Sequence, residues 1–380
     1  MVRSKIDFLY LNEQDMLKAG VANMPACIES MEEMFKLLYK GDYRMGGEDA
    51  NEHGIRLSFP KTSDIPGMPL HEPDKRMMAM PAYLGGKYHL YGCKTYGSNP
   101  HNPEVGQPRS ILMMQLLDAN TGAPKAYMSA NILSAMRTGA VSGLGAKWLA
   151  NKGAKVISII GPGVMSRYTL DAFMCAQPSV ETIKIKGRGM TNINRFIDYA
   201  KSKFPGIKNY QICETYEDVC RDSDIIFYGT TNAAKFEDNP YVEENWIKPG
   251  AVIISASALL IKTDFLAKEN VKLVADNYAM YAGWGDGNPL PTQKTVSTLL
   301  GMGFYDAVTE GKINRDSITE LGAVIAGDKV GRDNEKQIVV YAVGGMSLED
   351  VAWGYECYQN ALKNGIGVKL NLWDEPELMK

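Results

Sequence analysis

The sequence predicts an α/β protein built around a doubly wound parallel sheet. The clearest sign is the segment 155–188, in which a β-branched run ending at Ile160 meets the turn Gly161-Pro162-Gly163, a helical stretch and a second strand. A strand, a glycine turn, a helix and a strand form a βαβ unit, the usual cradle of a dinucleotide. Short apolar strands and helical segments then alternate to about residue 275, as expected for a sheet covered by helices on both faces.

The composition indicates a small-molecule protein. The 380 residues carry 41 basic and 44 acidic side chains, a net charge of −3, which does not suggest a nucleic-acid-binding surface. The six cysteines form no C-x-x-C pair, so we expect reduced thiols, with neither a disulfide framework nor a zinc site. The start lacks an apolar signal core, and no run approaches the roughly 18 apolar residues of a membrane span. We therefore expect a cytoplasmic protein without a metal.

The chain before residue 155 predicts helices and a sheet with turns. Asn12 is positioned to cap a short helix, and apolar residues at helical spacing predict a second helix over 24–40. Alternating runs separated by Gly, Pro and Asp predict strands; they cover 53–59, 76–84, 88–95, 110–117 and 124–128. The polar segment 97–108 has no periodicity of its own, and such loops are often functional.

A helix from about Ser129 or Asn131 to Ala150 combines small residues with one strong charge, Arg137, in its first four turns. Three glycines inside this helix cost about 1 kcal/mol each relative to alanine, so close backbone packing or ligand approach must compensate. A cation on such an apolar helix must be paired or must face a ligand.

Beyond the βαβ unit the pattern continues to alternate. Helices are expected over 191–203, 216–221, 295–310 and 347–364, strands over 210–213, 224–229, 251–257, 271–275 and 337–343, and a loop over 283–291. Glu349 and Asp350 fall in the first turn of the last helix, where the helix dipole favours acids.

The glycine turn and the end of the second strand suggest which ligand binds. Gly161 and Gly163 allow the backbone to approach a pyrophosphate at a helix N-terminus, although Ser166 replaces the third glycine of the G-x-G-x-x-G pattern. At the strand end, no acid stands ready for a ribose 2′-hydroxyl, whereas Arg188, with Lys186 and Thr191 nearby, suits a 2′-phosphate. We therefore favour NADP(H), with NAD(H) as the alternative. The competing interpretations are an ordinary strand-to-helix turn and solvated surface charges.

Three cations, Arg56, Lys94 and Arg137, lie at or near the ends of strand-like or helical segments, and each alone is more often a surface or ion-paired residue than a ligand-binding one. No H-E-x-x-H or G-x-S-x-G pattern occurs, so zinc-enzyme and hydrolase functions lack their residues.

Together these motifs resemble the ornithine cyclodeaminase/mu-crystallin family. The residues that carry the resemblance are 54–57, 80–84, 92–94, 117–122, 135–140, 161–163, 319–322, 326–327 and 337–343. The resemblance implies a Rossmann domain, residues 136–325, inserted in an α+β substrate-binding and dimerisation domain made of residues 1–135 and 326–380. It also implies a homodimer formed through the sheet of the latter domain.

The resemblance also implies residue roles. Arg56, Lys94 and Arg137 would bind the substrate carboxylate and orient its imine or amine, with Lys94 and Arg137 in the catalytic site; a guanidinium fork suits a planar carboxylate. The cofactor would be held by Ser110, Thr138, Gly161, Gly163, Val164, Met165, Ser166, Arg188, Thr191 and Ser257. Of these, Ser110 would lie near the nicotinamide, and Val164 to Ser166 would offer backbone amides.

One departure from the family pattern bears on the reaction. Cyclodeaminases carry an aspartate just after the strand that corresponds to 251–257, whereas this chain has no acid there until Asp264, as in the ketimine-reductase branch. The leading hypothesis is an NADP(H)-preferring oxidoreductase that reduces the C=N bond of a carboxylate-bearing imine or ketimine, or oxidises an amino acid in the reverse direction. The alternatives are a cyclodeaminase-type lyase that recycles NAD and uses Asp264 or Asp276, and a non-enzymatic NADP-binding protein.

Overall fold

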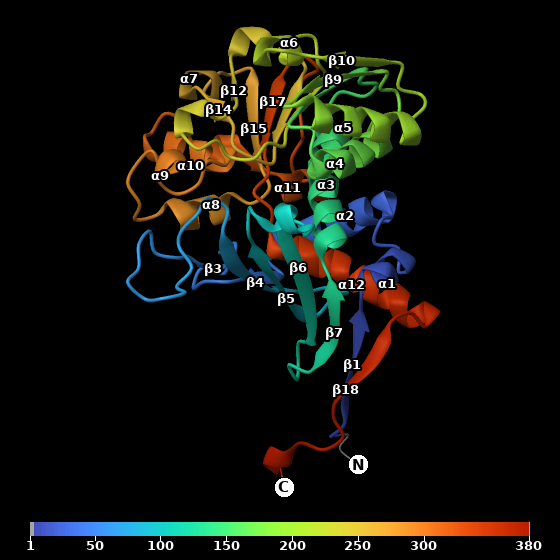
Figure 1. The fold of residues 1–380 in the computed structure, drawn as a ribbon. Helices are drawn as coiled ribbons and strands as arrows, with labels where there is room; N and C mark the ends of the chain where they lie inside the picture. The colour runs from blue at the N-terminus through green and yellow to red at the C-terminus, as the bar shows by residue number, and fades with distance from the viewer. Residues whose placement is uncertain (1–3, 380) are drawn as a thin grey trace. The chain divides into compact units, whose positions relative to one another are not determined.

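The computed structural model describes residues 4–379, which form two compact units, and each unit is built on its own large sheet (Figure 1). Unit 1 takes the described residues of Met1–Asn23, Lys40–Arg137 and Met346–Lys380, and unit 2 takes Met24–Tyr39 and Thr138–Gly345. No helix among the described residues combines the length and apolar character needed to cross a membrane.

Unit 2 contains an eight-stranded parallel sheet in the order β10-β9-β8-β11-β13-β17-β15-β16. The strands are β8 (Val156–Ile160), β9 (Thr182–Lys186), β10 (Asn209–Ile212), β11 (Ile225–Tyr228), β13 (Val252–Ser255), β15 (Val271–Ala275), β16 (Ile318–Glu320) and β17 (Ile338–Ala342). Its helices are α2 (Met24–Lys40), α3 (Asn131–Trp148), α4 (Val164–Ala176), α5 (Met190–Lys203), α6 (Tyr216–Cys220), α7 (Thr263–Leu266), α8 (Tyr278–Gly285), α9 (Thr292–Thr295), α10 (Leu300–Thr309) and α11 (Leu321–Ala326). A small pair of strands, β12 (Tyr241–Val242) and β14 (Leu260–Ile261), stands beside the large sheet.

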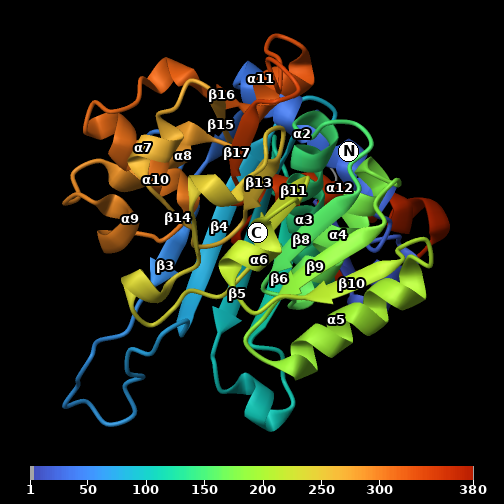
Figure 2. The same ribbon diagram turned by 90° about the horizontal axis from the view of Figure 1, so that it is seen from above.

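The connections of unit 2 determine where a ligand binds. The chain steps from β8 through β9 to β10 in one direction and then returns to β11 on the other side of β8. Because parallel crossovers are right-handed, α4 and α5 cover one face and α6 the other; Figure 2 shows α4 and α5 side by side. The strand order therefore reverses between β8 and β11, and open α/β sheets bind ligands outside the carboxyl ends of the strands at such a point.

The three glycines of α3 are explained by packing. A Cβ atom on Gly139 would lie 2.7 Å from the carbonyl carbon of Tyr168, and one on Gly143 would lie 2.4 Å from the Cβ of Ala172, both in α4. A Cβ on Gly145 would meet the side chains of Ile254 and Tyr341, on β13 and β17. Close packing against α4 and the sheet therefore compensates for the helix-propensity cost of these glycines.

Unit 1 contains a largely antiparallel sheet in the order β18-β1-β7-β6-β5-β4-β2, with β3 paired to β4. The strands are β1 (Ile6–Leu11), β2 (Tyr43–Met45), β3 (Ile55–Leu57), β4 (Arg76–Leu84), β5 (Leu90–Ser98), β6 (Ser110–Asp118), β7 (Pro124–Ser129) and β18 (Val368–Trp373). The long helix α12 (Ser347–Asn364) packs across β4, β5 and β6, and the short helix α1 (Glu13–Lys18) packs against α12.

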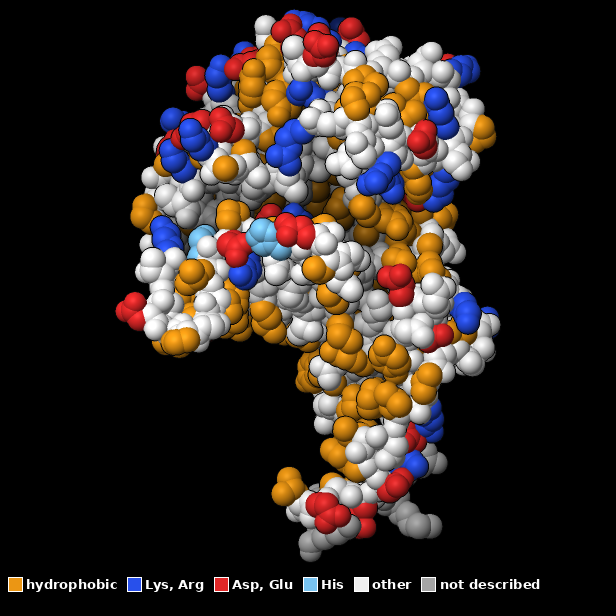
Figure 3. Space-filling model, in the orientation of Figure 1, with side chains coloured by type: hydrophobic (Ala, Val, Ile, Leu, Met, Phe, Trp, Pro, Cys, Tyr) orange, Lys and Arg blue, Asp and Glu red, His pale blue; other side chains and the backbone are white. Residues whose placement is uncertain are grey.

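The two faces of this sheet differ. Side chains alternate along each strand, so Met78, Met80 and Met114 are buried on the face that α12 covers, here called the inner face. The opposite, outer face carries exposed apolar side chains from several strands; they include Met77, Tyr91, Ile111, Val368, Leu370 and Leu372. Figure 3 shows apolar side chains gathered over β7, β1 and β18.

The predicted α/β class and Rossmann-type sheet are confirmed, and α2 and α12 have the predicted bounds. Several details differ. Strand β17 lies inside the parallel sheet, although the sequence analysis assigned residues from 326 onward to the other domain, and α2 belongs to unit 2. Helix α8 extends into the predicted loop 283–291, the helix predicted over 295–310 begins at Leu300, and the pairing of β1 with β18 was not predicted.

Candidate functional site

A pocket of about 560 Å³ opens in unit 2 at the carboxyl ends of β8, β9 and β11. Its lining includes Gly161, Gly163, Gly187, Arg188, Gly229 and Thr230. This is the point at which the strand order reverses, where the topology predicts a ligand.

The glycine turn after β8 has the form that a pyrophosphate requires. Gly161 has φ +88°, and a Cβ there would lie 2.7 Å from the carbonyl oxygen of Gly229, so only glycine fits. No side chain caps α4 at Gly163, so the amides of Val164, Met165 and Ser166 point out of the helix without intrahelical acceptors. An uncapped helix N-terminus behind a glycine turn suits an anion, and the residues present therefore fit a dinucleotide.

Ser166, the departure from the third glycine, also has a physical explanation. Its side chain is buried and its hydroxyl donates a 2.6 Å hydrogen bond to the carbonyl oxygen of Gly161. The Oγ atom of Ser166 also lies 3.1 Å from the place that a Cβ on Gly229 would occupy. Ser166 thus closes the turn and still permits α4 to pack against the end of β11.

The end of β9 carries a cation and no acid. Lys186 ends the strand, and a Cβ on the following Gly187 would lie 2.9 Å from the ring of Pro162. The exposed Arg188 lines the pocket and donates a 2.9 Å hydrogen bond to Thr231 Oγ1. The one carboxylate of the lining, Asp238, comes from a short turn after β11. Thr191, in the first turn of α5, is exposed and is not part of the lining.

The segment after β13 offers hydroxyls rather than an acid. Ser257 is buried, and its Oγ accepts a 3.1 Å hydrogen bond from the amide of Thr230, a pocket residue. Of the two acids considered for a lyase, Asp264 is exposed on α7. Asp276 is buried, and its carboxylate accepts hydrogen bonds from the amides of residues 277, 344 and 345 and from the Tyr281 hydroxyl. Asp276 is therefore engaged in holding the loop before α12.

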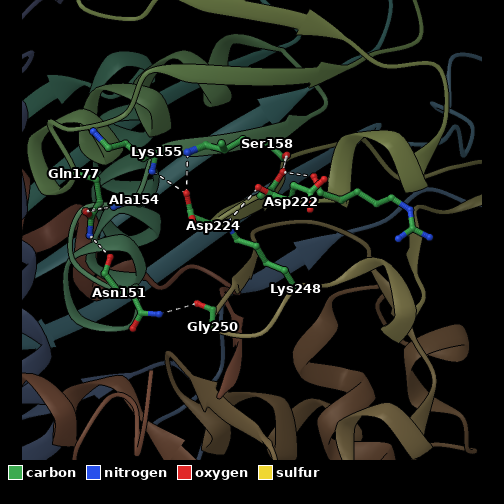
Figure 4. Close-up of polar contacts among 12 residues, drawn as sticks. Asn151, Ala154, Lys155, Ser158, Gln177, Asp222, Asp224, Lys248 and Gly250 are labelled. Carbon is green, nitrogen blue, oxygen red and sulfur yellow. Dashed lines mark hydrogen bonds and ion pairs between the residues drawn. The ribbon is translucent and has the colours of Figure 1, made fainter. Parts of the chain in front are cut away.

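A second group of polar residues in unit 2 lies at the opposite, amino-terminal edge of the parallel sheet (Figure 4). Asp224 Oδ2 accepts hydrogen bonds of 2.7 and 2.9 Å from the amides of Lys155 and Val156, and its Oδ1 lies 2.6 Å from Lys248 Nζ. Burial raises the pKa of Asp224, but Lys248 and the two amides outweigh it and hold the pKa below its usual range. These contacts join the starts of β8 and β11, so we assign them to the fold rather than to a site.

Unit 1 buries a cluster of four charges under α12. Lys94 comes from β5, Arg137 from α3, and Glu349 and Asp350 from the first turn of α12. Lys94 Nζ lies 2.6 Å from Asp350 Oδ2, Arg137 Nε lies 3.1 Å from Asp350 Oδ1, and Arg137 Nη1 donates to Glu349. Lys94 and Arg137 are 2% and 5% exposed, so these are ion pairs shielded from water.

The cluster has two cations and two carboxylates, which makes its burial tolerable. The acids also benefit from the helix dipole, and Glu349 Oε1 accepts a 3.0 Å hydrogen bond from the amide of Met346. Burial, followed by the neighbouring Arg137, lowers the pKa of Lys94 to about 8, although Asp350 opposes this shift. Lys94 is therefore the one member of the cluster positioned to exchange a proton near neutral pH.

The predicted substrate-site cations are only partly brought together. Lys94 and Arg137 share Asp350, as described. Arg56 is exposed on β3, and its side chain makes no hydrogen bond or ion pair with residues 4–379. Ser110 is hydrogen-bonded to Ser98 on the inner face of unit 1, and the half-buried Thr138 is the first residue of unit 2 in α3.

Glu349 and Asp350 are site residues that the sequence analysis missed, because their position suggested dipole interactions alone. The signal that could have found them is the surrounding sequence, Ser347-Leu-Glu-Asp-Val-Ala-Trp, in which two acids sit among apolar residues on both sides. Acids in such a run are expected to be buried, and a buried acid requires a cation.

Comparison with known proteins gives relatives along nearly the whole chain. The chain is 28% identical to the N-((2S)-2-amino-2-carboxyethyl)-L-glutamate dehydrogenase of Staphylococcus aureus, over 97% of this chain and 99% of the relative. It is 25% identical to a Delta(1)-pyrroline-2-carboxylate reductase of Bacillus cereus, over 80% of this chain and 87% of the relative.

A solved structure with a similar fold is Delta(1)-pyrroline-2-carboxylate reductase of Thermococcus litoralis in complex with NADH and L-proline. It has a TM-score of 0.75 and 26% identity, and the match covers 96% of this chain and all of the other. The sequence model of one family, ornithine cyclodeaminase/mu-crystallin, matches residues 21–365. Because this model covers most of the chain, the chain belongs to the ornithine cyclodeaminase/mu-crystallin family.

Proposed function

We propose that this chain is a nicotinamide-dependent oxidoreductase that reduces the C=N bond of a carboxylate-bearing imine or ketimine, or oxidises the corresponding amino acid or secondary amine. The observation that carries the proposal is the buried Lys94–Asp350–Arg137–Glu349 cluster, in a chain that also has a dinucleotide cradle. The relatives are named as reductases of a cyclic imino acid and as dehydrogenases of amino acids, which supports the same reaction class.

The chain's own residues have distinct tasks in this proposal. Arg137 keeps guanidinium donors beyond those used by Glu349 and Asp350, and these bind the substrate carboxylate. Lys94 holds the proton that the substrate nitrogen receives, and Asp350 positions the Lys94 ammonium. Arg56, on the same sheet, binds substrate from the exposed side. The bound cofactor supplies the hydride, and the cradle from Gly161 to Ser166, with Thr138 and Ser257, fixes its position.

A cyclodeaminase-type reaction is less well supported, because its two candidate acids are otherwise placed. Asp264 is exposed, and Asp276 accepts four hydrogen bonds from its own surroundings. After β13 the chain offers the Ser257 hydroxyl, which is bonded to the Thr230 amide, in place of an acid.

The first prediction concerns the reaction. The purified protein should oxidise NADPH or NADH in the presence of a cyclic ketimine carboxylate or of a 2-oxo acid with an amine, as followed by nicotinamide absorbance. Lys94→Met should lower kcat by about 10²- to 10⁴-fold. Because it leaves two buried carboxylates with one cation, a thermal melt of the variant should accompany the assay. Arg137→Ala would leave Glu349 buried without a cation, although Lys94 would still pair with Asp350, and it is therefore a poorer test. Bound cofactor without turnover of either substrate set would contradict the proposal.

The second prediction concerns pH. Because the pKa of Lys94 is about 8, reduction should lose rate as pH rises through about 8, while oxidation, which needs the neutral amine, should gain rate over the same interval. Asp350→Asn removes a carboxylate that raises the pKa of Lys94, so the basic limb of the reduction profile should move to lower pH. A limb that stayed in place in Asp350→Asn would show that Lys94 is not the titrating group.

We further propose that NADP(H) is preferred over NAD(H). Arg188 follows β9 at the position where NAD enzymes usually carry an acid, and it lines the pocket with Lys186. A guanidinium binds a phosphate bidentately and so favours the 2′-phosphate.

The third prediction tests this preference. Arg188→Gln should lower kcat/KM for NADPH at least tenfold and leave kcat/KM for NADH nearly unchanged. Arg195→Gln, an exposed arginine on α5 outside the pocket lining, is the matched control and should change neither. A wild-type protein that favours NADH, or an equal loss with both cofactors in Arg188→Gln, would contradict the preference.

We propose that the chain forms a homodimer through the outer face of the unit 1 sheet. Met77, Tyr91, Ile111 and Leu370 are each at least 40% exposed there, and a continuous apolar face of this kind favours a partner surface. Strand β18 is exposed along its whole length, which adds to the same face.

The fourth prediction concerns the molecular mass of the protein in solution. Light scattering should give twice the mass of one chain, and the double variant Ile111→Glu/Leu370→Glu should give one chain, because it places charges in the apolar face. Leu362→Glu, on an exposed apolar residue of α12, should leave the dimer intact. A wild-type monomer, or a dimer that persisted in the double variant, would rule out this face.

A further inference from the structure

The inner face of the unit 1 sheet holds more cations than one substrate carboxylate requires. The strand register places residues of neighbouring strands in rows that point to the same side. Arg56 on β3, Met78 on β4 and Tyr96 on β5 form one row, and Met80 and Lys94 belong to the next. Because Met78 and Met80 are buried on the inner face, Arg56, Tyr96 and Lys94 share that face.

Arg76 joins this group. It is two residues before Met78 on β4, so it lies on the same face and is a diagonal neighbour of both Arg56 and Tyr96. Diagonal neighbours in antiparallel strands are about 7–8 Å apart at the backbone, within reach of long side chains. Arginines on two strands thus flank Met78 at the end of the sheet where β4 begins.

The charge at this end is not balanced by the acids around it. Arg76 Nη1 lies 2.9 Å from Asp74 Oδ1, and Arg109 Nη1 lies 3.2 Å from Asp74 Oδ2, so two guanidinium groups share one carboxylate. Arg56 adds a third cation without a partner among residues 4–379. The next acid along the chain, Glu72, is already bound by Lys75 and His101.

The ring of Tyr96 connects this group with the buried cluster. Lys94 Nζ is 6.0 Å and Arg76 Cζ is 5.8 Å from the ring centre. The two cations are therefore at most about 12 Å apart. A substrate nitrogen bonded to Lys94 and a carboxylate bonded to Arg76, each at about 2.8 Å, would then be at most roughly 6 Å apart, and an amino diacid with a chain of four or five carbons fits within this limit.

We propose that the substrate carries a second acidic group, which Arg76 binds over Tyr96 with help from Arg56, while Lys94 contacts the reacting nitrogen and Arg137 binds the carboxylate next to it. The inference rests on the proposed function, which it narrows to imino or amino acids with a second carboxylate. Arg76 is then a specificity residue: it binds the remote end of the substrate, away from the reacting carbon.

In the oxidation direction, the test compares each amino diacid with its neutral isostere, for example L-glutamate with L-glutamine and L-aspartate with L-asparagine. In the reductive direction, it compares 2-oxo diacids with 2-oxo monoacids, each in the presence of ammonia. The wild-type protein should show kcat/KM at least tenfold higher for the acidic member of the pairs it accepts. Arg76→Gln should remove this preference by raising KM for the acid, with kcat/KM for the neutral partner unchanged, and Arg76→Lys should restore part of it.

Arg44→Gln is the matched control, because Arg44 is an exposed arginine of β2 that pairs with Tyr83 on the outer face. It should leave the preference intact. Equal turnover of acidic and neutral partners, or an equal loss with both in Arg76→Gln, would overturn this inference and leave the proposed function standing. Failure of every compound in this panel, and also of the cyclic ketimine carboxylates and the amine-coupled 2-oxo acids of the first prediction, would instead contradict the proposed function, and the inference with it.

Discussion

The pairing of four buried charges is a constraint on which the structure of unit 1 depends. Lys94, Arg137, Glu349 and Asp350 come from β5, α3 and α12, three elements far apart in the chain, and none of these side chains is more than 7% exposed. A buried charge without a partner is costly, and removing one member of such a cluster strands another. The cluster therefore fixes α12 across the sheet, and it includes Lys94, whose pKa burial lowers to about 8.

Unit 2 meets a different constraint, the close approach of backbone to ligand. Gly161 and Gly229 meet too closely for side chains, and Ser166 folds its hydroxyl back onto the turn. The cradle is thus made of amides and a helix N-terminus, whose chemistry does not depend on side-chain identity. A charged side chain lines the pocket at the end of β9, where Arg188 stands, and the proposed preference for NADP(H) rests on this residue.

Much of this was predictable from local patterns. The βαβ unit and the helices α2 and α12 follow from hydrophobic periodicity and glycine positions, and these elements have the expected bounds or lie within a few residues of them. The pairing of β1 with β18 was not predictable, because it joins residues more than 350 positions apart and the short runs carry no signal of their partner. The place of β17 inside the parallel sheet is likewise a property of the whole fold.

The candidate site, like the fold, could be predicted only in part from the sequence. Lys94 and Arg137 were expected as site residues, but that each is bound to Asp350 depends on tertiary structure, and Glu349 and Asp350 looked like ordinary acids at a helix start. Nothing in the sequence near Asp74 marks Arg76 as a ligand-binding residue. Only the strand register shows that it shares a face with Lys94 and Arg56.

The central claim, transfer of hydride to the carbon of a C=N bond, is tested most directly by isotope labelling. The protein would be given its accepted imine substrate with reduced cofactor that carries two deuterium atoms at nicotinamide C4, and the product analysed by mass spectrometry. The account predicts one deuterium on the former imine carbon, in proportion to the cofactor oxidised. A product without deuterium, formed with release of ammonia and no net oxidation of the cofactor, would contradict it.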